Sequence, residues 1–317
     1  MLTPAVAFVA ALVASAILTP LIRGAATQRG LLDEPDERKV HEVAIPRLGG
    51  VAIGGALFLG VVAALLVATR VEPSLTILSG DLPAILLGTA LIAGVGIIDD
   101  LRGMRARVKL VAQVGIALVA VAFGLSLDRL DGPWGSLVLG AWSVPLTVAW
   151  IVAVINAVNL IDGLDGLASG VALTALGALF VIASAGGAMP PYLIVLAAGA
   201  GGVIGFLRFN LHPASIIMGD TGAMLLGFVV AAVGVSVTQR LPTGVPPWVP
   251  VIAIGLPLTD TAWAILRRLA AGDPIFAPDK RHIHHQLLAA GLSQRAVMLM
   301  LWLASVALGM VAVVLAR

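Results

Sequence analysis

The chain lacks cysteine altogether, has a single tyrosine, and devotes only 11% of its 317 residues to charged side chains. Without cysteine there can be no disulfide framework, no thiol nucleophile and no cysteine-ligated metal. Any bound metal must therefore use oxygen or imidazole ligands. So few charges also leave too little polar surface to cover a water-soluble globule of this length, which excludes that class of protein.

What the chain has in abundance is apolar sequence, with 60% hydrophobic residues and a mean hydropathy of +1.07. The apolar residues form runs close to the roughly 20 residues that cross a bilayer as a helix. We predict an all-α, polytopic integral membrane protein with about ten transmembrane helices, forming a single transmembrane domain over residues 1–317. The predicted spans are 3–22, 49–68, 82–98, 108–126, 142–158, 167–186, 191–208, 221–238, 248–266 and 296–316.

Basic residues are distributed unevenly between the two sets of connecting segments. Of the 19 Lys and Arg residues, only Arg70, Arg129, Arg240 and the terminal Arg317 fall on the poorer side. The positive-inside rule assigns the richer set to the cytoplasm, and an even number of spans then places both termini outside. The basic charge thus reflects membrane topology and does not indicate a nucleic-acid partner.

Polar residues gather in five clusters, and all five fall on the predicted cytoplasmic side. They cover residues 33–41, Asp99-Asp100 with Lys109, 156–165, 210–221 and 279–285. Unrelated loop residues would be shared between the two faces of the membrane. Their segregation therefore indicates one active site at the cytoplasmic surface.

Asp99 and Asp100 end a run that is otherwise uncharged from Leu82 onward. Two adjacent carboxylates at a membrane boundary repel each other and resist burial unless a cation or proton compensates them. Lys109, at the start of the next predicted helix, could face them across a short connection. The alternative is a helix that simply ends in solvent.

Asn156, Asn159 and Asp162 stand three residues apart, a spacing that places them on one face of a helix as it leaves the membrane. The stretch continues through Gly163 and Asp165, and its glycines permit a turn that brings backbone close to a ligand. We therefore expect a binding segment here.

Asp220, in Gly219-Asp220-Thr221-Gly222, opens another predicted helix. It could act as the N-cap of that helix, as a ligand of a hard divalent cation, or as both.

Three of the five histidines, His282, His284 and His285, follow the basic pair Lys280-Arg281. Imidazoles with basic neighbours bind phosphate oxygens or a metal. Zinc is one candidate, but carboxylate-rich surroundings favour Mg²⁺ or Mn²⁺.

Taken together and in this order, the motifs resemble the polyprenyl-phosphate N-acetylhexosamine-1-phosphate transferases, a membrane family of the glycosyltransferase 4 type. The resemblance extends from about Asp33 to His285 and rests on Asp99-Asp100, Asp162-Gly163-Leu164-Asp165-Gly166 and Gly219-Asp220-Thr221-Gly222. The form His282-Ile283-His284-His285 is similar to the GlcNAc-1-phosphate branch. The phospho-MurNAc-pentapeptide transferase branch usually shows three successive histidines.

The resemblance implies transfer of a sugar-1-phosphate from a UDP-N-acetylhexosamine, expected to be UDP-GlcNAc, to undecaprenyl phosphate. The products would be UMP and a polyprenyl-diphosphate-linked sugar, the initiating step of cell-envelope polysaccharide synthesis such as lipopolysaccharide or teichoic acid. It also implies Mg²⁺, or Mn²⁺ in its place, and a multi-pass location in the cytoplasmic (inner) membrane. A homodimer is left open.

The resemblance also implies a role for each candidate residue. Asp220 would be the principal Mg²⁺ ligand, with Asp100 as a second ligand. The pair Asp99 and Asp100 would handle the carrier phosphate, and either of the two could take its proton. Lys109 would contact the phosphates. The substrate-binding residues would be Asn156, Asn159 and Asp162 at the nucleotide, Asp165 near the uracil, and Arg281, His282, His284 and His285 at the pyrophosphate or sugar.

An ion-coupled membrane transporter is the alternative from another functional class, because carboxylates in membrane proteins often carry protons or ions. Transporter sites usually lie near the bilayer midplane on interrupted helices related by internal repeats. Here the acids lie at predicted helix ends and no repeat is visible, so the pattern favours the transferase.

Overall fold

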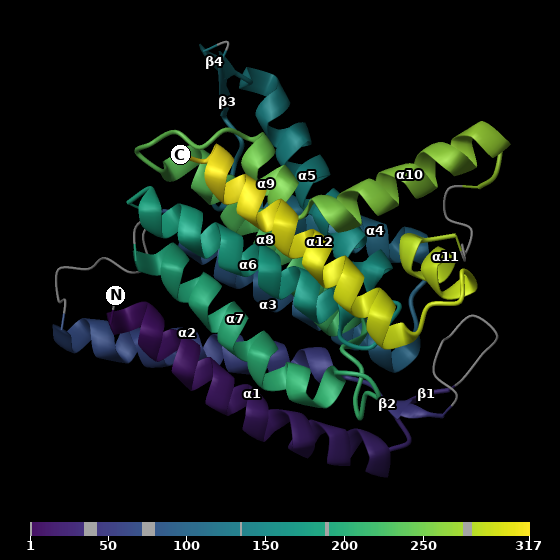
Figure 1. Cartoon of the computed structure of the whole chain (residues 1–317). Coiled ribbons are helices and arrows are strands. Elements are labelled where there is room, and N and C mark those ends of the chain that lie inside the picture. The colour runs from purple at the N-terminus through teal and green to yellow at the C-terminus, as the bar shows by residue number, and fades with distance from the viewer. Residues whose placement is uncertain (1, 35–42, 72–79, 134, 188–189, 275–280) are drawn as a thin grey trace.

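The computed structural model describes the whole chain except residues 1, 35–42, 72–79, 134, 188–189 and 275–280 (Figure 1). Nearly all of the regular structure is helical. The elements are α1 (Leu2–Gln28), β1 (Leu32–Asp33), β2 (Ile45–Pro46), α2 (Gly49–Val71), α3 (Leu82–Arg102), α4 (Ala106–Ala122), β3 (Arg129–Gly132), β4 (Gly135–Val138), the 3₁₀ turn η1 (Gly140–Trp142), α5 (Ser143–Ile161), α6 (Leu167–Ala185), α7 (Pro190–Asn210), α8 (Gly219–Arg240), α9 (Trp248–Ala253), α10 (Gly255–Ala271), α11 (Ile283–Ala289) and α12 (Gln294–Leu315).

Helices occupy every predicted span, which confirms a helical, polytopic membrane protein. In the described part of the chain, 8 helices are long and apolar enough to cross a membrane, judged by length and composition. The remaining two predicted spans differ from the expectation. Helix α4 has only 17 residues, and the segment 248–266 is divided between α9 and α10.

The division between α9 and α10 falls at Ile254, whose backbone (φ −109°, ψ 24°) lies outside the helical region. Pro250, Gly255 and Pro257 surround this point. Proline removes a backbone N–H and glycine resists helix formation, so the local sequence favours an interruption here. Helix α10 then leads away from the bundle, as its separate course in Figure 1 shows.

Helix α8 is the centre of the molecule, and every residue of its most apolar 18-residue window is buried. It packs against α2, α3, α5, α6 and α7. A helix that is apolar on all sides is stable only when other helices surround it, which is the case here. By contrast, α1 and α12 expose large apolar side chains such as Val13, Ile17, Leu303 and Val314, as expected of helices that face lipid.

Glycines allow two helices to approach the start of α8 at backbone distance. A Cβ at Gly50 of α2 would overlap backbone atoms of Gly222 and Thr221, and a Cβ at Gly96 of α3 would overlap those of Thr221. These contacts set the amino end of α8 against the carboxyl end of α3, where Asp99 and Asp100 stand.

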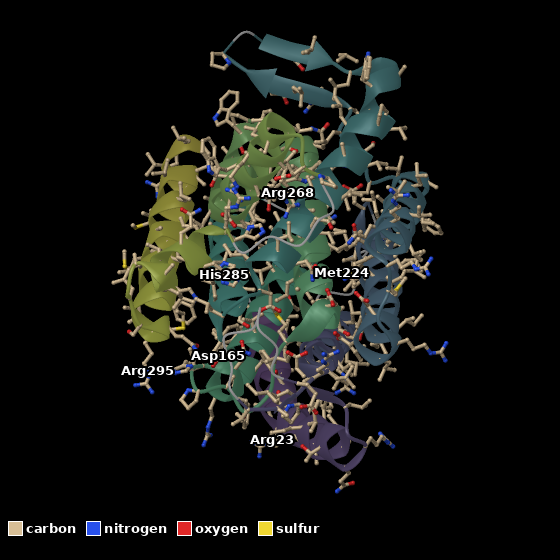
Figure 2. The ribbon with its side chains drawn as sticks, turned by 90° about the vertical axis from the view of Figure 1, so that its right-hand side faces the viewer. Arg23, Asp165, Met224, Arg268, His285 and Arg295 are labelled. Carbon is tan, nitrogen blue, oxygen red and sulfur yellow. The ribbon has the colours of Figure 1, made fainter. Side chains whose placement is uncertain are left out.

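The two ends of the bundle differ in character. In Figure 1 the N- and C-termini lie toward the left, whereas α11 and the strand pair β1–β2 lie at the opposite end. Figure 2 looks onto that opposite end, over which Arg23, Asp165, Arg268, His285 and Arg295 are spread. The candidate site is built there, and a second antiparallel pair, β3–β4, forms a hairpin elsewhere on the molecule.

Candidate active site

Asp99 and Asp100 are buried at the end of α3, with exposed fractions of 5% and 9%. Asp100 accepts hydrogen bonds from the backbone N–H of Asp220 (2.9 Å) and of Thr221 (3.0 Å), and from the Thr221 hydroxyl (2.5 Å). A helix that simply ends in solvent is therefore wrong for this segment. Asp100 supplies acceptors to the amino end of α8, a role normally taken by an N-cap residue.

The same contacts overturn the idea that Asp220 caps its own helix. Asp220 lies in the first turn of α8, and its N–H is satisfied by Asp100. Gly219 precedes it with φ +70°, and a Cβ at Gly219 would come within 2.8 Å of the Asp100 carboxylate. Glycine is therefore required here both by the backbone conformation and by the space that Asp100 occupies.

The Asp220 side chain is the meeting point of three elements. Its Oδ1 accepts from Lys109 Nζ of α4 at 2.9 Å and from Asn159 Nδ2 of α5 at 2.5 Å. Lys109 also forms an ion pair with Asp99 of α3. A lysine thus bridges two aspartates that are 121 residues apart in the chain, and Asn159 approaches from the adjoining wall.

Asn156 lies one helical turn before Asn159, and both line the same cavity. Its Nδ2 donates to Gln113 Oε1 of α4 at 2.6 Å and to the Val152 carbonyl at 2.8 Å. Gln113 is fully buried and was not predicted from the sequence. A glutamine inside an apolar span was the available signal, because polar groups at membrane depth are retained where they have partners.

Asp162 and Asp165 follow the end of α5. Burial, with the negative charges of Asp220 and Asp100, raises the pKa of Asp162 well above its ordinary value. Asp165 Oδ2 lies 2.9 Å from His212 Nδ1 and accepts from the Ala214 N–H at 3.0 Å. In this structure Asp165 therefore holds the segment between α7 and α8, and its predicted position near uracil stays a prediction.

The histidine motif lies at the start of α11. His282 is buried, and its Nδ1 is 2.7 Å from Asp260 Oδ2. His284 is 1% exposed, and neither of its ring nitrogens has a hydrogen-bond partner in the described structure. Burial, and then the neighbouring imidazoles of His285 and His282, lower the pKa of His284 to about 3, so it is neutral near pH 7. Arg281 is exposed at the edge of this motif.

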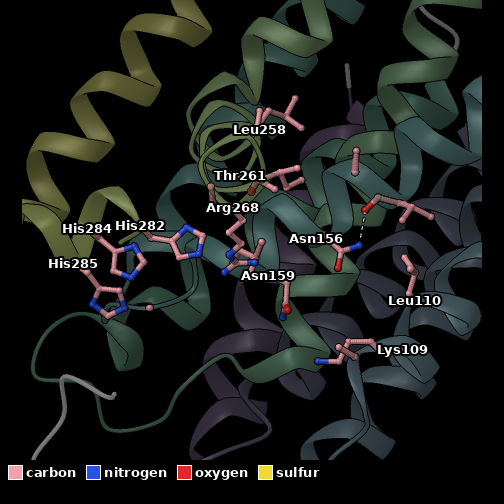
Figure 3. A pocket seen from close by; sticks show the side chains of 18 of the residues that line it. Lys109, Leu110, Asn156, Asn159, Leu258, Thr261, Arg268, His282, His284 and His285 are labelled. Atoms are coloured by element: carbon pink, nitrogen blue, oxygen red, sulfur yellow. Dashed lines mark hydrogen bonds between the residues drawn. The ribbon is translucent and has the colours of Figure 1, made fainter. Parts of the chain in front are cut away.

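The motifs from α4, α5, α10 and α11 surround one cavity of about 690 Å³ (Figure 3). The three histidines lie on one side of the close-up, Lys109 and Leu110 on the other, with Asn159 between them. Apolar side chains continue the wall; they include Leu110, Val152, Leu160, Leu258 and Ile265. The cavity thus joins a charged, hydrogen-bonding part to an apolar part, the combination that an amphiphilic ligand requires.

The first predicted cluster, residues 33–41, is only partly described. Asp33 is buried and forms an ion pair with Arg47, across the strand pair β1–β2. Residues 35–42 lie outside the described part of the chain, as do Asp279 and Lys280 of the last cluster.

Sequence reasoning also missed Asp260 and Arg268, and it gave Thr221 no role of its own within the Gly219-Asp220-Thr221-Gly222 motif. Asp260 is the clearest case, since it is an acid inside a predicted span, a feature that by itself indicates a functional site. Arg268 lines the cavity.

The donor groups fit a magnesium ion that is completed by substrate. The described residues contain no group of three or more His, Asp or Glu side chains arranged to hold a metal ion. However, Mg²⁺ is usually bound by one or two carboxylates plus substrate phosphates and waters. Asp220 is 32% exposed and uses only Oδ1 in its bonds to Lys109 and Asn159. Asp100 as a second ligand would have to share oxygens that already accept from α8.

Fold and site together define a helical membrane protein whose cavity is lined by a lysine, amides and imidazoles beside an apolar wall. Carboxylates lie next to these lining residues, Asp220 at Lys109 and Asp260 at His282. Comparison with known sequences places it more narrowly. The model of the family described as glycosyl transferase family 4 matches residues 82–238. The chain belongs to this family, which confirms the resemblance seen in its motifs.

Several curated proteins match over most of the chain. It is 39% identical over 316 residues to the "Probable undecaprenyl-phosphate N-acetylglucosaminyl 1-phosphate transferase" of Bacillus subtilis, covering 98% of this chain and 84% of that protein. It is 37% identical to the "Decaprenyl-phosphate N-acetylglucosaminephosphotransferase" of Mycobacterium tuberculosis, covering 91% and 77%. It is 32% identical to the "Undecaprenyl-phosphate alpha-N-acetylglucosaminyl 1-phosphate transferase" of Yersinia pestis, covering 92% and 79%.

Proposed function

We propose that this protein transfers GlcNAc-1-phosphate from UDP-GlcNAc to undecaprenyl phosphate, with Mg²⁺, releasing UMP. The relatives named above are polyprenyl-phosphate GlcNAc-1-phosphate transferases, and they match the chain over nearly its full length. The product, a polyprenyl-diphosphate-linked sugar, would begin a cell-envelope polysaccharide.

The observation that carries the proposal is the junction of Asp220, Lys109 and Asn159 at the edge of the mixed cavity. A lipid phosphate and a soluble nucleotide sugar can react only where a polar site opens beside an apolar surface. Both reactants are anions, so cationic groups must offset their repulsion. Lys109 and Arg268, which line the cavity, are cationic groups that can do this.

The proposed step is a single in-line displacement. An oxygen of the carrier phosphate attacks the phosphorus that bears the sugar, one P–O bond forms, and the P–O bond to UMP breaks. A phosphate monoester is already largely ionised near neutral pH, so the attack needs no obligatory base. In this step the chain supplies positioning and charge neutralisation, as in phosphoryl transfer generally.

The residues take distinct parts in this step. Asp220 would hold the Mg²⁺ ion, which when bound neutralises phosphate charge. Lys109 would donate to phosphate oxygens, Asn159 would orient the Asp220 carboxylate, and the neutral imidazole of His284 would pack beside Gly163 at the donor side. Leu110, Val152 and Ile265 would contact the first isoprene units of the carrier.

A two-step route through a phosphorylated aspartate is the mechanistic alternative. Asp100 would be the nucleophile, yet both of its oxygens accept hydrogen bonds from the start of α8. Attack would require breaking these bonds and uncapping the central helix. Trapping a phospho-enzyme at Asp100 would reverse this preference.

We also propose that the chain lies in the cytoplasmic membrane with ten spans, counting the α9–α10 pair as one, and with both termini outside. The site end then faces the cytosol, where nucleotide sugars are made. The distribution of basic residues supports this orientation.

The proposal is tested with purified protein in lipid nanodiscs. UDP-GlcNAc, undecaprenyl phosphate and Mg²⁺ are supplied, and both UMP release and lipid-linked product are measured. We expect equal amounts of the two products and none when Mg²⁺ is chelated. UDP-GalNAc and UDP-MurNAc-pentapeptide serve as competing donors.

If UDP-MurNAc-pentapeptide is the only donor that is turned over, the protein is instead a phospho-MurNAc-pentapeptide transferase of peptidoglycan synthesis. If no donor gives product and the protein carries an ion flux in sealed vesicles, the protein is instead an ion-coupled transporter.

A further inference from the structure

Asp260 is a buried carboxylate in the middle of an apolar stretch. It is the sole charged residue between Gly255 and Arg267 in the sequence, and its side chain is 7% exposed. Burying an ionised carboxylate costs several kcal/mol unless hydrogen-bond donors compensate it. The position of Asp260 in α10 therefore requires specific partners.

Both carboxylate oxygens of Asp260 are used, and both reach the start of α11. Oδ2 lies 2.7 Å from Nδ1 of His282, and Oδ1 accepts from the backbone N–H of Ile283 at 2.9 Å. The His282 side chain is 6% exposed, so this contact is protected from water. One acid thus ties α10 to the first residues of the histidine motif.

We infer that Asp260 is a positioning residue for His282, fixing the orientation of its imidazole and the nitrogen that carries the hydrogen. This inference rests on the proposed function. A carboxylate opposite Nδ1 requires a hydrogen on Nδ1, and it leaves Nε2 on the opposite edge of the ring, toward the cavity that His282 lines. Nε2 could take a proton from water and donate it in a hydrogen bond to an anionic substrate oxygen, and the carboxylate would stabilise the resulting positive charge on the ring.

The neighbouring histidine shows that the arrangement is specific. His284 is stacked parallel to His282, with ring planes 7° apart and centroids 6.0 Å apart. Yet neither nitrogen of His284 has a hydrogen-bond partner in the described structure. The carboxylate is therefore directed to one imidazole of the motif.

The turn of α10 that carries Asp260 also faces the cavity. Thr261, the next residue, lines it, and its hydroxyl is buried without a hydrogen-bond partner in the described part of the chain. Leu258 and Arg268 of the same helix line it too (Figure 3). Asp260 thereby links the helix that forms one wall of the cavity to the motif that forms another.

Asp260→Asn separates positioning from simple support of α11. Asparagine keeps an acceptor for the Ile283 N–H, but its amide nitrogen can place a hydrogen opposite Nδ1. His282 would then carry its own hydrogen on Nε2. The substitution thus preserves the shape of the contact and reverses its hydrogen-bond direction.

The first test is direct and needs no turnover. The ¹⁵N spectrum of protein labelled at histidine reports which ring nitrogen is protonated, and the signals of His282 are identified with His282→Gln. We expect the Nδ1–H form in the wild type and a change of form in Asp260→Asn. Unchanged His282 signals in Asp260→Asn would overturn the inference.

The second test is kinetic. We expect Asp260→Asn to lower kcat roughly 10- to 100-fold, the range found when partners of a functional imidazole are removed, with a smaller change in KM for UDP-GlcNAc. Asp260→Glu should restore part of the rate, because it restores the carboxylate. The matched control is Asp273→Asn, which alters an exposed acid just beyond the same helix and should retain the wild-type kcat.

A rate loss in Asp260→Asn that merely follows a loss of thermal stability, with no recovery in Asp260→Glu, would assign Asp260 a structural role and overturn the inference. Should the wild type transfer no sugar at all, the proposed function fails, while the ¹⁵N spectra still decide whether Asp260 sets the form of His282.

Discussion

At the scale of single residues, the aspartates of this site differ in their partners and hence in what they can do. The carboxylate of Asp100 accepts hydrogen bonds from the amino end of α8, and Asp99 forms an ion pair with Lys109. Asp220 shares Lys109 but keeps one oxygen outside its bonds to Lys109 and Asn159 and is the more exposed. Asp220 is therefore the carboxylate best placed to meet a cation together with substrate phosphate.

Replacing Asp220 by Ala should abolish turnover, lowering kcat by at least about 10³-fold, comparable to the loss of a principal electrostatic group. UMP release is measured at saturating Mg²⁺. The control is Asp131→Ala in β3, whose side chain pairs with Arg129 on the hairpin. Near-normal rates for Asp220→Ala would refute its assigned role.

The low pKa of His284 makes stability depend on pH. Its folded-state pKa of about 3 lies below the ordinary 6.5, so between these values the unfolded chain binds more protons. The stabilisation is complete above pH 6.5 and is lost progressively as the pH falls toward 3. At pH 5 the loss should be about 2 kcal/mol.

Thermal unfolding of the wild type and of His284→Gln, followed from pH 7.5 to pH 4.5, checks this dependence. The difference in Tm between the two proteins should shrink as the pH falls. A constant difference would show that His284 titrates normally in the folded protein.

At the scale of elements, the site depends on how closely α3 and α2 approach the start of α8. Gly96 and Gly50 make those approaches, and no side chain fits there without moving backbone. Because interiors are close-packed, such a movement is transmitted to the residues beside it. The residues beside it here are Asp100 and Asp220.

Gly96→Ala should therefore destabilise the protein by roughly 1–3 kcal/mol through overpacking and lower kcat by displacing Asp220 from Lys109. Gly94→Ala is the matched control on the same helix, since a Cβ at Gly94 meets nothing within 4 Å. Alanine favours helix over glycine, so the control should be neutral or slightly more stable. Thermal unfolding and UMP release distinguish the two variants, and equal behaviour would contradict the packing argument.

At the scale of the whole molecule, the polar site and the termini lie at opposite ends of the helical bundle (Figure 1). The absence of cysteine in the natural chain makes each introduced cysteine a unique reporter of sidedness. Ser136 in β4 and Ala290 after α11 are both exposed and suit this purpose.

In intact cells, an impermeant maleimide should label Ser136→Cys from outside and leave Ala290→Cys unlabelled until the membrane is opened. Each variant must first retain UMP release, so that the labelled protein is the functional one. Labelling of Ala290→Cys from outside would invert the proposed orientation and remove the site from the cytosol.

The amino-acid sequence by itself determined the membrane class, the approximate positions of the long helices and many of the residues gathered at the site. These follow from local properties: the length of apolar runs, the uneven placement of Lys and Arg, and short motifs with characteristic spacing. Asp99, Lys109, Asn159 and Asp220 were all named from such patterns, and the structure brings their side chains into one connected set.

Only the tertiary structure decided which side chains form hydrogen bonds with one another. That Asp100 caps α8, that Gln113 holds Asn156, and that Asp260 reaches His282 across 22 residues all depend on helix packing. Hydrogen-bond partners are chosen by distance in space, and a single sequence does not record which helices are neighbours. The interruption at Ile254 was missed for a related reason, because hydropathy averages over a span and does not register a local break in the backbone.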